Sequence, residues 1–107
     1  MTDVIQVATT TDSLEAAQSL ARHLVTQRVA ACVQVVGPVR SCYRWQGEIQ
    51  NDEEWQCVAK TRADAFQRLD SAIREVHTYD VPEILATPVV AGSREYLEWV
   101  DQQTRPD

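Results

Sequence analysis

The pattern of hydrophobic and polar positions indicates a strand at the start of the chain and a helix soon after. Asp3 to Thr9 carries β-branched residues in a short run, which is typical of a strand. Asp12 and Glu15 form a capping pattern, and the apolar residues that follow repeat at helical spacing. This part of the sequence therefore predicts a strand followed by a helix over about residues 13–28.

The centre of the chain predicts a long hairpin. Ala30 to Trp45 is rich in β-branched and aromatic residues, Gln46-Gly47 is a turn signal, and Glu48 to Thr61 alternates apolar with polar positions. Gly37-Pro38 interrupts the first arm, and because proline has no N–H to donate we expect a bulge or an edge position there. Arms of roughly 14 residues reach about 45 Å, longer than the sheet of a domain this size. The aromatic distal half therefore needs a partner chain to cover it.

The last third of the chain predicts a helix, a strand and a second helix. The first helix starts at Asp64, carries apolar residues on one face and ends before Pro82. Ile84 to Val90 is a core strand near an edge, because it contains Pro88, and Ser93 caps the terminal helix. The order βαββαβ plus a C-terminal helix indicates an α+β fold. We expect a ferredoxin-like sandwich with two helices on one face of an antiparallel sheet and a long central hairpin.

Length and composition indicate one folded domain over residues 1–107, because 44% of the residues are hydrophobic and only three are Gly and four Pro. The formal charge of −6 comes from 16 acidic and 10 basic residues, and scattered arginines do not form the basic face that a nucleic-acid partner requires. The N-terminus has no basic region ahead of its apolar run, and no apolar stretch approaches the ~20 residues of a membrane span. We expect a cytoplasmic protein without a membrane partner.

Three cysteines, an odd number without Cys-x-x-Cys spacing, argue against a disulfide framework or a structural zinc site. Cys32 lies at an apolar strand start, where it is either a buried, inert thiol or a soft ligand for copper. Cys42 and Cys57 lie on opposite arms of the hairpin, and the turn places Cys42 opposite about Asn51. These two thiols should not meet within one chain.

The junction between the second predicted helix and the last strand gathers an imidazole, a phenol and two carboxylates. His77 either caps the helix end or serves as a metal ligand or proton carrier. Asp80 and Glu83 are hard oxygen ligands in principle, although carboxylates in such a turn are commonly solvated. Copper(I) prefers thiolate, whereas copper(II) prefers imidazole and carboxylate, so Cys32 and this junction need not form one site.

Lys60 is the only lysine of the chain, and it stands in a β-rich segment where its charge must reach solvent or a partner. Either a carboxylate such as Glu54 or Glu83 pairs with it, or it belongs to a ligand-binding site. Tyr43 and Trp45 are most simply packing or interface residues. No Ser-His-Asp set and no glycine-rich phosphate loop stand out, so we do not expect an enzyme.

Five motifs, in order along nearly the whole chain, resemble the CutA family of divalent-cation tolerance proteins. They are Ala31-Cys32-Val33-Gln34, Ser41-Cys42-Tyr43-Arg44-Trp45-Gln46-Gly47, Lys60-Thr61, His77-Thr78-Tyr79-Asp80-Val81-Pro82-Glu83 and Tyr96-Leu97-Glu98-Trp99. Their order is far more specific than any single motif. Gln34 and Thr78 depart from the asparagine and the proline of the family pattern, which affects the local backbone and side-chain bonds but not the fold.

The resemblance implies a homotrimer in which the long hairpin wraps a neighbouring subunit. It also implies tolerance or response to copper and other divalent metal ions, with Cys32 as a metal ligand and with His77 and Glu83 as further candidates. The residues that match a ligand cleft between subunits are Trp45, Lys60, His77, Tyr79 and Glu83. Two alternatives remain: a PII-like signalling trimer that binds a small ligand, and a trimeric scaffold whose motif residues serve only the interface.

Overall fold

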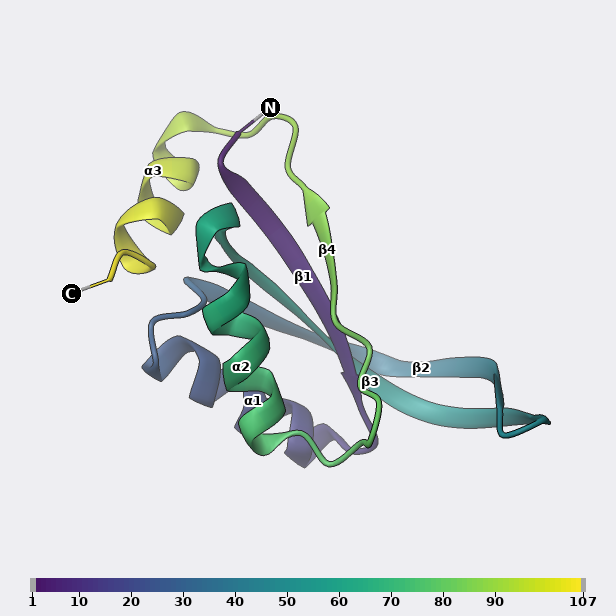
Figure 1. Cartoon of the computed structure of the whole chain (residues 1–107). Helices are drawn as coiled ribbons and strands as arrows, with labels where there is room; N and C mark the ends of the chain where they lie inside the picture. Colours follow the sequence, from purple (N-terminus) through teal and green to yellow (C-terminus); the bar gives the residue numbers. More distant parts are fainter. Residues whose placement is uncertain (1, 107) are drawn as a thin grey trace.

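The computed structural model describes residues 2–106 as a four-stranded antiparallel sheet with helices packed against it (Figure 1). The strands lie in the order β2-β3-β1-β4, which confirms the predicted α+β, ferredoxin-like arrangement. In chain order the elements are β1 (Val4–Thr11), α1 (Leu14–Thr26), β2 (Cys32–Trp45), β3 (Glu48–Arg62), the 3₁₀ turn η1 (Ala63–Ala65), α2 (Phe66–Val76), β4 (Leu85–Pro88) and α3 (Arg94–Gln103).

The main hydrophobic core lies between one face of the sheet and helices α1 and α2. Side chains alternate between the two faces of a strand, so the cross-strand neighbours Val7 and Ala59 both point towards these helices. The opposite side of the sheet, called the outer face below, carries their alternates Ala8 and Val58. The buried helix residues that complete the main core include Leu20, Leu24, Leu69 and Ile73.

Cys57 is part of the main core and is chemically quiet. Its thiol donates to the carbonyl oxygen of Ala17 at 3.5 Å, and burial raises its pKa to about 11. Cys42 is exposed on the other hairpin arm, where it faces Asn51 as the sequence predicts. The two thiols therefore lie at different levels of the sheet and do not meet.

Helix α3 packs away from the main core, at the end of the sheet where β1 begins (Figure 1). Its predicted cap is confirmed, since the Ser93 side chain accepts a hydrogen bond from the backbone N–H of Tyr96. Within residues 2–106, no helix is long and apolar enough to cross a bilayer. The second, smaller hydrophobic cluster beneath α3 consists of Val4, Ala31 and Val100, bordered by Val89 and Leu97.

The hairpin formed by β2 and β3 extends well beyond the helices (Figure 1), and the longest dimension of the chain is 44 Å. The register shifts between Val36 and Val39, which confirms the bulge predicted at Gly37-Pro38. Gln46 and Gly47 both have positive φ, as a tight two-residue hairpin turn requires. Near this turn Ile49 is 64% exposed, so the distal hairpin has no cover from its own chain.

Some element boundaries differ from the predicted ones. The sequence predicts a last strand from Ile84 to Val90, but β4 runs only from Leu85 to Pro88, and beyond it Val89 still donates a backbone bond to Val4. The first strand is longer than predicted and continues to Thr11, because β3 runs beside it to that point. The second helix begins through the 3₁₀ turn Ala63–Ala65 rather than directly at Asp64.

Gly37 gives a first test of the bulge. A Cβ at this position would come within 2.6 Å of the Trp55 Cδ1 atom, so a side chain requires the indole ring or the strand to move. We predict that Gly37→Ala lowers the free energy of unfolding by about 1–3 kcal/mol, measured by urea denaturation. Val36→Ala trims an exposed neighbour and should change it by less than about 0.5 kcal/mol. Equal losses in the two variants would contradict this packing.

Candidate functional site

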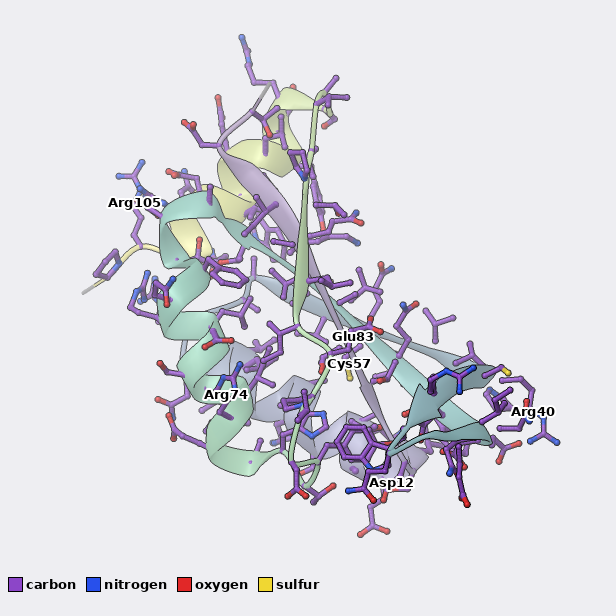
Figure 2. The ribbon with its side chains drawn as sticks, turned by 45° about the vertical axis from the view of Figure 1, so that its right-hand side comes forward. Asp12, Arg40, Cys57, Arg74, Glu83 and Arg105 are labelled. Atoms are coloured by element: carbon purple, nitrogen blue, oxygen red, sulfur yellow. The ribbon has the colours of Figure 1, made fainter. Side chains whose placement is uncertain are left out.

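An open groove of about 960 Å³ lies between the hairpin and the segment that joins α2 to β4. Figure 2 shows Asp12 at the end of β1 and Glu83 on the joining segment, with Arg40 further out on the hairpin. The groove is therefore built from three parts of the chain that are distant in sequence. Its carboxylates and aromatic rings are those of Asp12, Asp52, Glu53, Glu54, Asp80, Glu83, Tyr43, Trp45 and Tyr79.

The groove is electrostatically one-sided. Every charged side chain in its wall is a carboxylate, and no lysine or arginine of residues 2–106 contributes to the wall. Carboxylates that share one partly enclosed space repel one another and favour the approach of cations. The rings of Tyr43 and Trp45 are each 42% exposed, and their faces also attract cations.

Two tyrosine hydroxyls fix two of these carboxylates on β3. Tyr79 donates to Glu54 Oε2 at 2.7 Å, and Tyr43 donates to Asp52. Burial raises the pKa of Tyr79, and the hydrogen bond to Glu54 raises it further. Glu54 is only 6% exposed, so the Tyr79 hydroxyl satisfies a carboxylate that has little access to water.

His77 ends α2 and joins this segment to the sheet. Its Nδ1 accepts a hydrogen bond from the backbone N–H of Tyr79 at 3.1 Å, so this nitrogen carries no proton. Its Nε2 lies 2.8 Å from the carbonyl oxygen of Thr10 and must be the donor in that contact. Both ring nitrogens of His77 therefore bind backbone groups, and they set the direction from which Tyr79 reaches Glu54.

Cys32 and Lys60 are direct cross-strand neighbours on the outer face of the sheet. The Lys60 ammonium donates to Gln34 Oε1 at 2.6 Å, and within residues 2–106 it forms no ion pair. Of the two predicted alternatives, the pairing of Lys60 with Glu54 or Glu83 does not occur within residues 2–106 of one chain. Gln34 stands where the CutA pattern has asparagine, and its side chain, which is longer than that of asparagine, reaches the Lys60 ammonium.

The Cys32 thiol has a second neighbour from the C-terminal helix. The pKa of Tyr96 is raised first by burial and then by the Cys32 thiol, so the tyrosine and the thiol are electrostatic neighbours. Tyr96 also lies against Trp99, with ring centroids 5.6 Å apart. Cys32 is half-buried at this point, in contrast to the exposed Cys42 and the buried Cys57.

The structure divides the predicted site residues into two groups. Trp45, Tyr79 and Glu83 line the groove, and His77 lies directly behind it. Cys32 and Lys60 lie together at the other end of the outer face. Because Lys60 and Glu54 are six positions apart along β3, roughly 20 Å of strand separates the two groups.

Sequence reasoning missed the carboxylates on β3 that dominate the groove wall. Asp52, Glu53 and Glu54 form an acidic run inside a strand, and that run was an available signal because acidic residues are depleted in strands. Their bonding partners were not predictable, because Tyr79 reaches Glu54 only through the folded path of the joining segment.

Comparisons with known proteins identify relatives of the whole chain. The sequence pattern of the family described as CutA1 divalent ion tolerance protein matches residues 5–103. The chain is 44% identical over 98 residues to the divalent-cation tolerance protein CutA of Thermus thermophilus, covering 92% of this chain and 95% of that protein. It is 40% identical over 101 residues to the chloroplastic protein CutA of Arabidopsis thaliana, covering 94% of this chain and 56% of that protein.

Solved structures of related proteins share this fold. The crystal structure of CutA from Xylella fastidiosa superposes with a TM-score of 0.94 at 35% identity, covering 97% of this chain and 100% of that one. This similarity extends over the sheet, the long hairpin and the C-terminal helix alike.

The two tyrosine–carboxylate bonds make a matched pair for a test. Tyr79→Phe leaves the buried Glu54 carboxylate without its donor, so we predict a loss of about 1–3 kcal/mol in the free energy of unfolding. Tyr43→Phe removes the same kind of bond from an exposed pair and should change stability little, because water replaces the donor. Urea denaturation of both variants measures the difference. A larger loss for Tyr43→Phe would show that Glu54 is not the buried partner.

Proposed function

The chain belongs to the CutA1 family of divalent ion tolerance proteins, and from that premise we propose that it is a cytoplasmic homotrimer that binds copper at sites shared between copies. We assign it the divalent-cation tolerance for which its relatives are named, as a binding protein rather than an enzyme. The observation that carries the proposal is the separation of the Cys32–Lys60 pair from the acidic groove. Both lie on the outer face, yet roughly 20 Å of strand keeps them apart within one chain.

The outer face supports assembly because its apolar residues are only partly covered within one chain. Ala8 and Val58 are cross-strand neighbours there, and Leu85 of the edge strand β4 pairs with Ala8 and is mostly exposed. The aromatic distal hairpin is uncovered as well. Contiguous apolar surface of this kind marks an interface in a folded protein. A neighbouring copy that covers this face removes the surface from water.

Charge on the outer face favours a head-to-tail contact. Among residues 2–106, Lys60 has no carboxylate partner and the groove wall holds no cationic side chain. When the lysine end of one copy meets the groove of the next, each supplies the missing charge. Such head-to-tail contacts do not form a two-fold dimer, and with a rotation of one third of a turn between copies they close into the proposed trimer. In this ring Lys60 of one copy joins Trp45 and Tyr79 of another in the intersubunit cleft.

The donor atoms of one chain do not make a closed metal site. Within residues 2–106, no group of three or more His, Cys, Asp and Glu side chains converges for a metal ion. Cys32 supplies one thiol, which suits copper(I), and the groove supplies carboxylates, which suit harder cations. The proposal therefore requires neighbouring copies to complete the coordination of copper by Cys32.

His77 and Glu83 differ as metal-ligand candidates. Both ring nitrogens of His77 bind backbone groups, so coordination of copper(II) would require exchange of one of these bonds. Glu83 is exposed in the groove wall and needs no such exchange. We therefore place Glu83 in a harder cation site at the groove and regard His77 chiefly as the residue that positions this wall.

The oligomeric state is the first test. We predict a mass of three 12.1 kDa chains by light scattering at micromolar concentration. Leu85→Asp places a charge on the outer face and should lower the fraction of trimer. Val25→Asp makes the same change at an exposed position on α1 and should leave assembly intact. A mass of one or two chains in the unaltered protein would rule out the trimer.

Copper binding is the second test. We predict that Cys32→Ser abolishes tight copper(I) binding in anaerobic titration, because serine cannot replace a soft thiolate. Cys42→Ser changes an exposed thiol and should bind copper(I) like the unaltered protein. If Cys32→Ser binds copper(I) unchanged while losing stability, the thiol is a packing residue. Binding of an adenine nucleotide without copper would instead favour a signalling trimer.

A further inference from the structure

The carboxylates of the groove wall receive no cation from residues 2–106. Six carboxylate residues line the groove: Asp12, Asp52, Glu53, Glu54, Asp80 and Glu83. Arg40 and Arg44 belong to the same hairpin, but neither of them lines the groove. The negative charge of this wall is therefore available to a ligand from outside the chain.

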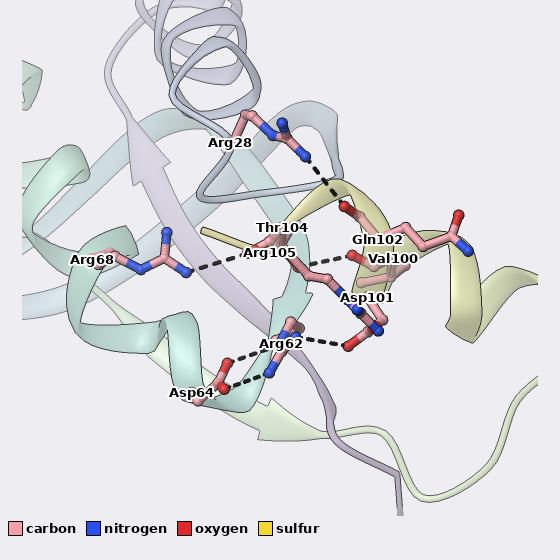
Figure 3. A network of polar contacts seen from close by, with 9 residues as sticks. All are labelled: Arg28, Arg62, Asp64, Arg68, Val100, Asp101, Gln102, Thr104 and Arg105. Atoms are coloured by element: carbon pink, nitrogen blue, oxygen red, sulfur yellow. Dashed lines mark hydrogen bonds and ion pairs between the residues drawn. The ribbon is translucent and has the colours of Figure 1, made fainter. Parts of the chain in front are cut away.

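The arginines that make ordered contacts gather elsewhere. Four of them bind carbonyl oxygens or carboxylates around the C-terminal end of α3, as Figure 3 shows: Arg28, Arg62, Arg68 and Arg105. Helix α3 packs where β1 begins, whereas the groove lies where β1 ends. The eight residues of β1 span roughly 25 Å, so these guanidinium groups do not neutralise the groove.

Glu54 provides independent evidence that the groove receives a cation. The residue is only 6% exposed, and the Tyr79 hydroxyl donates to its Oε2 atom. Within residues 2–106, the Oε1 atom has neither a hydrogen bond nor an ion pair. A carboxylate accepts several hydrogen bonds, and burial of its charge with a single donor is costly. Because Glu54 borders the groove, a cationic donor bound there would complete its bonding.

The spacing of the carboxylates favours a chain-like cation over a single ion. A coordinated ion needs its ligand atoms within about 2–2.6 Å, and within residues 2–106 no three His, Cys, Asp or Glu side chains converge in this way. Asp52 and Glu54 lie two positions apart on one face of β3, which is roughly 7 Å along the strand. The carbon chain of 1,4-diaminobutane holds two ammonium groups at a similar separation.

The aromatic rings of the groove favour an organic cation. Tyr43 and Trp45 are two positions apart on β2, line the groove and are each 42% exposed. The faces of such rings attract ammonium groups, and their apolar surface packs against methylene groups. A hydrated metal ion would use the charge of the wall but not this apolar surface.

We propose that the groove binds a linear polyamine, which is an alkyl chain that carries two or more ammonium groups. The ammonium groups bind Glu54 and Asp52, and the methylene groups lie on the rings of Tyr43 and Trp45. This inference rests on the proposed hard-cation site at the groove and names its ligand class, but it requires no copper. In the proposed trimer, Lys60 of a neighbouring copy supplies one positive charge to a wall of six carboxylates, so the cleft still attracts this ligand.

Calorimetric titration of the unaltered protein tests the ligand class. We expect spermidine to bind at least about tenfold more tightly than butylammonium, which has a similar carbon chain but one charge. We expect the same preference over Mg²⁺ at equal ionic strength, because Mg²⁺ makes no contact with the rings. Spermidine that binds no more tightly than butylammonium or Mg²⁺ would overturn the proposal.

A pair of carboxylate variants tests the position of the ligand. Glu54→Gln preserves the shape and can still accept from Tyr79 but removes the charge, so we expect spermidine binding to weaken by about tenfold. Glu75→Gln makes the same change of net charge on α2, where the carboxylate lies beside His23, and should bind spermidine normally. If Glu54→Gln does not fold, Asp52→Asn replaces it in the comparison. Normal binding by Glu54→Gln, or by Asp52→Asn in its place, would overturn the proposal.

A pair of tryptophan variants separates ring contacts from charge. Trp45 and Trp99 are 42% and 40% exposed, but only Trp45 lines the groove. We expect Trp45→Leu to weaken spermidine binding by about fivefold without changing Mg²⁺ binding, and Trp99→Leu to change neither. If Trp45→Leu does not fold, Tyr43→Leu replaces it. Equal binding of spermidine by the groove variant and Trp99→Leu would contradict the ring contact. A protein that binds spermidine but no copper(I) contradicts only the proposed role of Cys32, and one that binds copper(I) but no spermidine contradicts only this inference.

Discussion

The structure depends on the difference in length between β3 and its neighbour β1. β3 has 15 residues and β1 has 8, so β1 accompanies only the second half of β3, from Trp55 to Arg62. The helices cover the shared part, and the main core lies there. Beyond Trp55, β2 is the only strand within residues 2–106 that pairs with β3, and the groove begins at Glu54. The uncovered hairpin and the position of the groove beside it follow from this difference in length.

The same geometry separates two kinds of donor atom. The soft thiol of Cys32 lies in a row that crosses all four strands, whereas the hard carboxylates lie where the hairpin, the end of β1 and the joining segment meet. A single strand, β3, connects these regions as a rigid spacer. Thiol and carboxylate donors, which differ in the cations they prefer, therefore lie at opposite ends of one sheet face.

The sequence predicted most of the fold because its signals are local. Gly37-Pro38 and Gln46-Gly47 determine the bulge and the turn through their own backbone preferences, and the two helices follow from apolar spacing. The side-chain partners in the site could not be predicted in this way. The bond from Tyr79 to Glu54 depends on how the segment after α2 crosses the end of β1, which His77 fixes by bonding Thr10. Lys60 reaches Gln34 because β2 and β3 pair in one particular register.

The hairpin also affects the order of events during folding. β2 and β3 are consecutive and joined by a two-residue turn, so their pairing needs only local loop closure and forms within about microseconds. Pairing of β1 with β3 and with β4 joins segments that are distant in sequence, so it is slower than formation of the local hairpin. The aromatic hairpin consequently exists before the rest of the sheet can hold it. While the rest of the sheet is incomplete, the aromatic side chains of this hairpin are exposed to solvent. Exposed apolar surface on partly folded chains promotes aggregation, and high local concentrations of newly made chains increase that tendency.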